Sequence, residues 1–263
     1  MCTVIVHVPA SADEPTRLLA VRDEDPGRPW NPVGPWWPDT YPGVVGVRDA
    51  RAGGAWLAAD AEGRRLAVLL NREDVEGLPD EGLESRGGVV LEAVAGRTPA
   101  EPPRTHGFNL VEVEGPKVVV TTWDGDVLRT TELAPGTHMI AHDDVDDEAT
   151  PRIAHWLTPF ADAHAAREER DAHASREERN AQAAREARDA AAPIDWFDPW
   201  FALLEASADL PPTDDRAIIR DNRPLGYPTL SLLMCAATIG PDGVDVACGA
   251  FDEPGHWNAL TLA

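Results

Sequence analysis

Short apolar runs separated by turn residues make up the first half of the chain, a pattern typical of antiparallel strands. The opening run, residues 2–8, is almost wholly apolar and predicts a buried strand. Turn signals such as Asp124-Gly125 favour hairpins between neighbouring runs. The pattern predicts strands over residues 2–8, 18–21, 44–48, 56–59, 66–71, 108–113, 118–123 and 138–142, with a short helix over 85–95.

Proline interrupts this pattern between residues 25 and 42, where six prolines accompany three tryptophans, Trp30, Trp36 and Trp37. Proline lacks a backbone N–H, so we expect a loop ordered by packing and neither a strand nor a helix. The tryptophans either staple this loop to a sheet or form one wall of an apolar ligand pocket.

Helical character begins after Pro151. Residues 163–189 hold three tandem nine-residue copies, AHAAREERD, AHASREERN and AQAAREARD, built from strong helix formers. Nine residues turn through about 900°, so equivalent positions fall on opposite faces and no single buried stripe persists. We expect a solvated, charged helical insertion; a coiled coil or a partner-binding helix is the alternative.

A second, amphipathic helix is predicted from Trp196, and strand patterns return over 229–239, 244–247 and 256–262. The turn at 240–243 makes a hairpin of the first two of these strands. Strands, then helices, then strands imply a sheet assembled from both ends of the chain and covered by the helices. We predict a single α+β domain over residues 1–263, with mainly antiparallel sheets.

Charge and cysteine content narrow the function. Lys+Arg total 23 against 46 Asp+Glu, a formal net charge of −23 that repels phosphate backbones, so we expect no nucleic-acid partner. No apolar run is long enough to span a bilayer and no signal peptide opens the chain, so we expect a soluble, cytoplasmic protein without a membrane span. The three cysteines suggest no disulfide framework, and Cys235 and Cys248 are expected in the core.

Cys2 is the first candidate for chemistry, because it follows Met1 at the head of the first predicted strand. Removal of Met1 would leave a thiol and a free α-amine on one residue. An α-amine with a pKa near about 7.7–8 can accept the proton of its own side chain, as in N-terminal nucleophiles. The alternative is a small buried strand residue.

Charged residues end the next strand, at Val21-Arg22-Asp23-Glu24-Asp25. If residues 2–8 and 18–21 form a hairpin, Arg22 and Asp23 lie near Cys2, where an arginine would lower the thiol pKa. A charged strand end in solvent is the alternative.

Asparagines at strand ends add two further candidates. Asn71 and Asn109 can each donate to a developing oxyanion or cap a turn. The eight histidines show no metal-binding spacing, and no nucleotide-binding motif occurs, so we predict neither a metal nor a nucleotide.

Several segments follow one another along the chain: MCTVIV, LLAVRDEDPGRPW, RDARAGGAWLAADAEGRRLAVLLNRED, ESRGGVV, THGFNL and GHW. In this order they resemble the NRDE family, also called the transport and Golgi organisation family. That family is similar to N-terminal nucleophile hydrolases, which implies a four-layer αββα sandwich. The resemblance also implies Cys2 as nucleophile, Arg22 and Asp23 as its neighbours, and Asn71 as an oxyanion donor.

Departures from the family pattern weaken the case for hydrolysis. The family's first motif asparagine is Val21 here, and His142 stands where a Leu-Ser-Asn element has its asparagine. The family's late Tyr-Gly-Thr-Arg reads Leu225-Gly226-Tyr227-Pro228, without the arginine. The nonapeptide repeat resembles nothing in the family and is an insertion of this chain.

Two functions follow. The first is a Cys2-dependent hydrolase or acyltransferase acting on an amide (C–N) or ester bond of a small molecule, without a cofactor. The second is a non-catalytic carrier of haem or an acyl lipid, an activity that the resemblance also implies, with Trp30, Trp36, Trp37, Asn109 and His142 as candidate ligand-binding residues.

Overall fold

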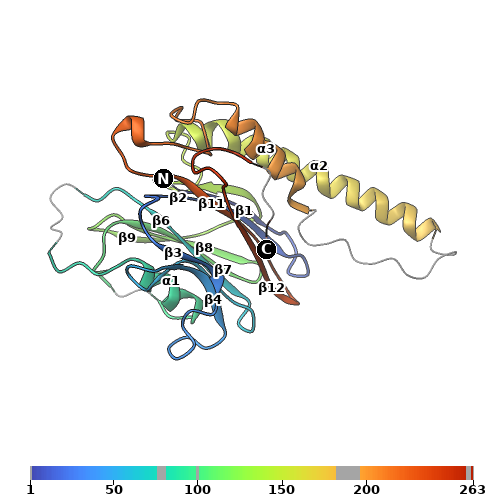
Figure 1. Ribbon diagram of the computed structural model, residues 1–263. Coiled ribbons are helices and arrows are strands. Elements are labelled where there is room, and N and C mark those ends of the chain that lie inside the picture. The colour runs from blue at the N-terminus through green and yellow to red at the C-terminus, as the bar shows by residue number, and fades with distance from the viewer. Residues whose placement is uncertain (1, 76–80, 99–100, 182–195, 259–261, 263) are drawn as a thin grey trace.

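Apolar side chains on both faces of the N-terminal strand place that strand inside the molecule. The computed structural model describes residues 2–75, 81–98, 101–181, 196–258 and 262. Two antiparallel sheets pack face to face, and helices cover their outer faces, giving the expected αββα sandwich (Figure 1). Val4 and Val6 of the first strand face the core between the sheets, whereas Ile5 faces the helices on the outer side.

The five-stranded sheet is assembled from both ends of the chain, as the order of strands and helices predicts. Its first strand lies between two antiparallel neighbours, with Thr3 opposite Val21 and Val4 opposite Ile140. The predicted hairpin of the first two strands is therefore confirmed. In the order β10-β1-β2-β11-β12, its strands are β1 (Thr3–Val8), β2 (Thr16–Glu24), β10 (Gly136–Ile140), β11 (Leu230–Gly240) and β12 (Gly243–Ala250).

The seven-stranded sheet is a meander in which each strand pairs with the next along the chain. Its inner face shares the core with β1, β2 and β11. Its strands are β3 (Trp30–Gly34), β4 (Val44–Asp49), β5 (Ala55–Asp60), β6 (Arg65–Asn71), β7 (Phe108–Glu114), β8 (Lys117–Trp123) and β9 (Leu128–Glu132).

Both edges of this sheet differ from the prediction. The proline-rich loop contains strand β3, which tolerates Pro32 because an edge strand pairs on one side only. The opposite edge strand, β9, was not predicted because its sequence, LRTTE, is polar on both faces. The strand predicted over 256–262 is also wrong at residues 256–258, which form no strand; 259–261 lie outside the described residues.

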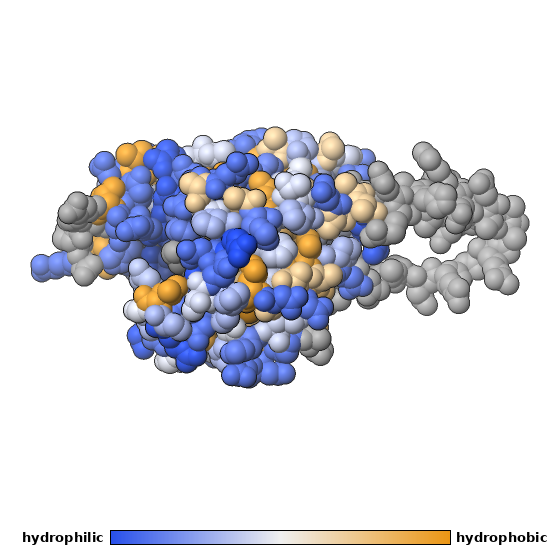
Figure 2. Space-filling model, turned by 90° about the horizontal axis from the view of Figure 1, so that it is seen from above, coloured by the Kyte–Doolittle hydropathy of each residue, from blue (hydrophilic) through white to orange (hydrophobic). Residues whose placement is uncertain are grey.

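Helices form the two outer layers. α1 (Gly87–Val94) covers β5 and β6, whereas α2 (Pro151–Ala181) and α3 (Asp198–Ala208) cover the five-stranded sheet. The 3₁₀ turn η2 (Arg223–Leu225) precedes β11. In the part of the chain that the structure describes, no helix is both long enough and apolar enough to cross a membrane. Seen from above, the surface is mainly hydrophilic, with apolar residues in small separate groups (Figure 2).

The repeat forms the far half of α2, which continues past the edge of the sheets (Figure 1). Helix is confirmed to Ala181, and residues 182–189 of the repeat lie outside the described residues. Its first copy is not wholly solvated as expected. His164 is buried, and its ring stacks on His7 of β1 with 3.3 Å between the ring centroids.

Cys235 and Cys248 form a disulfide, which corrects the expectation that they are unpaired core residues. They lie opposite each other on β11 and β12, and the hairpin closes with Gly240 opposite Gly243. Each cysteine is five residues from that closing pair. A hairpin that turns at 240–243 places Cys235 and Cys248 opposite each other. The predicted turn therefore indicated this disulfide, whereas the number and spacing of the cysteines did not.

Candidate active site

Cys2 immediately precedes β1 and lies beside the charged end of β2. Thr3 is opposite Val21 on β2, and Val4 is opposite Ile140 on β10. Continuing the β1–β2 ladder by one residue brings Arg22 beside Cys2, whereas on the other side β10 ends at Ile140, two residues before His142. Cross-strand neighbours have Cβ atoms about 4.5–5.5 Å apart, so the Arg22 side chain is close to the thiol, and its charge acts on Cys2.

The Cys2 thiol is buried against the core between the sheets. Its Sγ donates to the backbone carbonyl of Asp23 at 3.7 Å. Burial raises the pKa of Cys2, and the Asp23 carboxylate raises it further, whereas Arg22 lowers it by less. The depressed thiol pKa expected from the arginine is therefore wrong for the chain that carries Met1, because desolvation outweighs one cation.

Asp23 is held by residues from the far end of the chain. Ser231 Oγ donates to Asp23 Oδ1 at 2.6 Å, and the backbone N–H of Arg220 donates to Ser231 Oγ at 2.9 Å. Arg152 of α2 donates to Thr3 Oγ1 at 2.7 Å, and burial lowers the Arg152 pKa to about 10 against the opposing charge of Asp23. The carboxylate thus has a fixed position beside the N-terminal strand.

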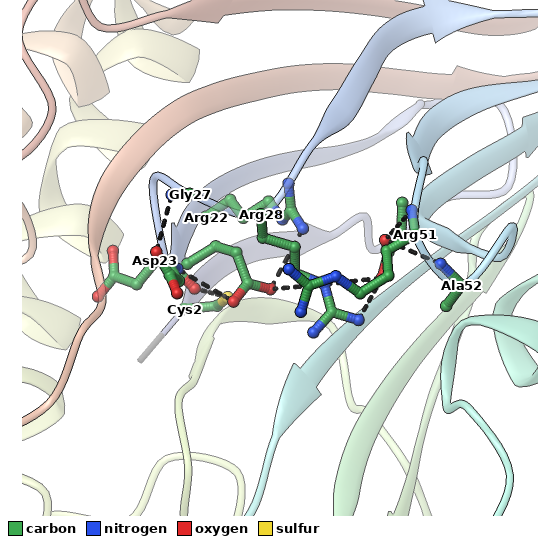
Figure 3. A network of polar contacts seen from close by, with 10 residues as sticks. Cys2, Arg22, Asp23, Gly27, Arg28, Arg51 and Ala52 are labelled. Atoms are coloured by element: carbon green, nitrogen blue, oxygen red, sulfur yellow. Dashed lines mark hydrogen bonds and ion pairs between the residues drawn. The ribbon is translucent and has the colours of Figure 1, made fainter.

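A chain of ion pairs links the end of β2 to the β4–β5 turn. Arg22 donates to Glu24 at 3.3 Å, and Glu24 lies 3.9 Å from Arg28. Arg28 in turn pairs with Asp49, a hydrogen bond that raises the pKa of Arg28. Figure 3 shows these contacts running from Cys2 and Asp23 to the backbone of Arg51 and Ala52, whose N–H groups donate to Asp49.

Two glycines hold α1 against this turn. A Cβ on Gly54 would lie 2.5 Å from the carbonyl carbon of Gly87, so only glycine permits the approach. Arg86 immediately precedes α1 and donates to the carbonyl of Gly107 at 2.9 Å. Arg86 is close enough to Cys2 and Glu24 for their charges to act on it.

Asn109 positions the loop that carries His142. Its Nδ2 donates to the carbonyls of Ala141 at 3.0 Å and Asp143 at 2.7 Å, while its Oδ1 accepts from Thr122. These bonds engage both the nitrogen and the oxygen of the Asn109 amide. Asn109 therefore holds the loop in position and does not face a ligand. Burial lowers the pKa of His142, which favours the neutral imidazole.

Comparison of the sequence with models of known families is independent of this geometry. The family model described as transport and Golgi organisation 2 matches residues 1–193. The chain belongs to this family. No curated protein matches it. The family match includes Cys2, Arg22, Asp23, Arg86 and Arg152, but β11, which contributes Ser231, lies beyond it.

The remaining predicted site residues are not gathered at Cys2. Asn71 pairs with Phe108, which packs in the α1 cluster on the other face of the seven-stranded sheet, and Asn71 is exposed. Trp37 and Trp36 pack toward that same cluster, whereas Trp30 packs toward the core between the sheets. The three tryptophans therefore form no common pocket wall.

Four residues around Cys2 and Asp23 escaped the sequence reasoning: Arg86 and Arg152, which act electrostatically with Cys2, and Arg220 and Ser231, which hold Asp23. Arg86 stood in the family segment ESRGGVV, which was quoted for resemblance without a role for its arginine. Ser231 is 208 residues from its partner Asp23, so no local pattern links the two. A search for polar residues at the starts of late strands would have found it.

Proposed function

We propose that this member of the transport and Golgi organisation 2 family is a cysteine N-terminal nucleophile enzyme that cleaves or transfers the acyl group of a small-molecule amide or ester. The position of Cys2 next to the β1–β2 ladder beside Arg22, with its Sγ on the backbone carbonyl of Asp23, is the observation that supports the proposal. Loss of Met1 would expose the α-amine on the residue that bears the thiol.

In the proposed reaction, the α-amine of Cys2 takes the thiol proton as Sγ bonds to the substrate carbonyl carbon. The neutral His142 and backbone N–H groups are the candidate donors to the oxyanion. When the C–N or C–O bond breaks, the α-ammonium returns its proton to the leaving amine or alkoxide. Water then attacks the thioester carbon, releasing the acid and restoring the thiol.

Asp23 has the supporting role of holding the α-ammonium, because its carboxylate is fixed by Ser231. Arg22 stabilises negative charge on Sγ or on the substrate. Asn71 has no part in this mechanism, because its strand pairing directs it to the other face of the sheet.

A non-catalytic carrier of haem or an acyl lipid is the second candidate. The burial and raised pKa of the Cys2 thiol favour it, because a protonated, buried thiol is a poor nucleophile. A carrier would bind haemin with a shifted Soret band, and Cys2→Ala would leave apolar ligand binding intact.

Intact-mass spectrometry after exposure to p-nitrophenyl octanoate tests the enzyme. We expect a chain without Met1 that gains one octanoyl group and releases nitrophenol. Cys2→Ala should abolish both, and Cys2→Ser should slow them strongly. Of the three cysteines only Cys2 is free, so the site of acylation is unambiguous.

Retention of Met1, or equal nitrophenol release by wild type and Cys2→Ala, would overturn the enzyme proposal. A Cys235→Ala/Cys248→Ala double variant is the matched control, because it removes the other two sulfurs and should keep the acyl adduct.

A further inference from the structure

Three of the four sheet edges are protected against pairing with another strand. The edge strand β3 contains Pro32, whose carbonyl already accepts from the Trp36 indole at 2.7 Å. β9 is five residues long, and its sequence, LRTTE, carries two charges. At β10 the following loop folds back, because the Asp146 carboxylate accepts from the Met139 N–H at 2.8 Å and the Asp146 N–H donates to the Met139 carbonyl at 3.0 Å. Proline, charge, shortness and a covering loop are the usual protection of an edge strand.

The fourth edge, β12, has none of these features. Its eight residues, GVDVACGA, include no proline, lysine or arginine, and Asp245 is the one charged residue among them. It forms the margin of the five-stranded sheet (Figure 1). Outside the ladder with β11, no backbone hydrogen bond joins residues 243–250 to any residue that the structure describes. The disulfide between Cys235 and Cys248 ties β12 to β11, so this edge is held in place.

Half of the backbone groups of β12 point away from β11. Gly240 and Gly243 close a two-residue loop, so their pair is hydrogen-bonded, and bonded pairs then alternate along the hairpin. The N–H of Phe251 donates to the carbonyl of Leu232 at 2.9 Å, which continues this alternation past the end of the strand. The N–H and C=O groups that face outward therefore belong to Val244, Val246, Cys248 and Ala250.

Apolar side chains accompany these outward-facing groups. Val244, Val246 and Cys248 lie on the inner face of β12 and pack at the margin of the core between the sheets, where they stay half-buried. Asp245 and Ala247 alternate with them on the outer face. A strand added to this edge would gain backbone hydrogen bonds and would also cover the margin of the core.

The sequence of β12 fits a second copy of itself. Antiparallel pairing about Val246 puts Val246 opposite its own copy and Val244 opposite Cys248, so the half-buried side chains meet on the inner face. On the outer face Asp245 comes opposite Ala247, so the charged residue of the strand opposes no charge. The neighbouring register, about Ala247, would put Val244 opposite Ala250 and would bury less apolar surface.

We propose that β12 is a self-association surface at which two copies of the chain pair antiparallel about Val246, so that their five-stranded sheets become one continuous sheet. The pairing is isologous, as expected for a twofold dimer. Its contact is one strand wide, and each copy carries a formal net charge of −23, so the dimer is weak and salt strengthens it by screening the repulsion.

Sedimentation velocity of the full chain, with its disulfide intact, measures the association. From about 5 to about 300 µM protein, we expect monomer to give way to dimer, because association follows mass action. The dissociation constant should fall at least twofold when KCl is raised from about 50 to about 300 mM. In the dimer, the amide hydrogens of residues 244, 246 and 248 should exchange at least tenfold more slowly than in the monomer.

Opposite charges at residue 247 test the register. Ala247→Lys would face Asp245 of the second copy at two symmetric positions and should lower the dissociation constant at least threefold, whereas Ala247→Asp should raise it at least threefold. Thr130→Lys and Thr130→Asp are the matched controls, because Thr130 is exposed on the edge strand β9. Both should leave the dissociation constant within twofold of wild type. Far-UV circular dichroism checks that all four variants keep the fold.

Monomer at every concentration would overturn the proposal, and so would a dimer in which the exchange of residues 244, 246 and 248 is unchanged. In the register about Ala247, residue 247 would face its own copy, so weakening by both charges would reject pairing about Val246. An equal effect of the Thr130 and Ala247 substitutions would show that overall charge, and not β12, governs the association.

Discussion

Gly87 lies so close to Gly54 that neither residue has room for a side chain. A Cβ on Gly54 would lie 2.5 Å from the backbone of Gly87, and a Cβ on Gly87 would lie 3.0 Å from the backbone of Gly54. The contact joins two segments quoted for the family resemblance, RDARAGGAW and ESRGGVV. It fixes the start of α1 and with it Arg86. One residue of each glycine pair, Gly54 and Gly87, is therefore explained by this backbone approach.

Gly54→Ala should destabilise the protein by about 2 kcal/mol, because the methyl group would meet backbone that cannot move aside cheaply. Gly88→Ala is the control. It lies in α1 with open space around it, so the added methyl group should stabilise the helix by up to about 1 kcal/mol. Urea unfolding midpoints measure both. Equal effects of the two substitutions would contradict the close approach.

Cys2 should react slowly with iodoacetamide at neutral pH in protein that retains Met1. Burial raises its thiol pKa, so the thiolate fraction grows only above the range of an ordinary thiol. The alkylation rate, followed by mass from pH 6 to 10, should rise late and be absent in Cys2→Ser. An early plateau near pH 7 would show an activated thiol in this form.

His7 should make the protein less stable in acid. Burial, with His164, Arg17 and His138, lowers the pKa of folded His7 to about 3, whereas the unfolded value is about 6.5. Below about pH 6.5, His7 binds a proton in the unfolded chain. In the folded chain it stays neutral until about pH 3. Stability contributed by neutral His7 is therefore present above pH 6.5 and is lost as the pH falls through this window.

His7→Gln should flatten this loss, measured as the drop in urea midpoint between pH 7 and pH 4.5. His256→Gln is the control, because His256 is 56% exposed and should leave the slope unchanged. The same slope in wild type and His7→Gln would mean that other groups set the acid sensitivity.

The repeat should be dispensable for folding beyond its first turn. Deleting residues 168–189 with a short glycine linker should shift the melting temperature by only a few degrees, since its period sustains no buried face. Deleting 163–189 should cost more, because it also removes His164 from its stack on His7. Equal losses, or a change of oligomeric state in the shorter deletion, would show that the repeat packs against something further.

Local patterns were sufficient for much of the fold and for part of the site. The apolar run at 2–8 and the following strand form a hairpin whose register depends on nearby residues, so the approach of Arg22 to Cys2 could be predicted. Edge strands β3 and β9 were missed because an edge strand can contain proline or be polar on both faces, which removes the signal of alternation.

By itself the sequence determined the inner strands, the helices, the hairpin of Cys2 with Arg22 and the family. Only the tertiary structure decided that Asn71 faces away, that Ser231 holds Asp23 across 208 positions, and that Arg86 lies within electrostatic range of Cys2. Strand and helix periods come from neighbouring residues, whereas these contacts depend on how separate layers pack. Burial acts in the same way: Arg22 alone predicts a lowered pKa for Cys2, and the packed core around the thiol reverses it.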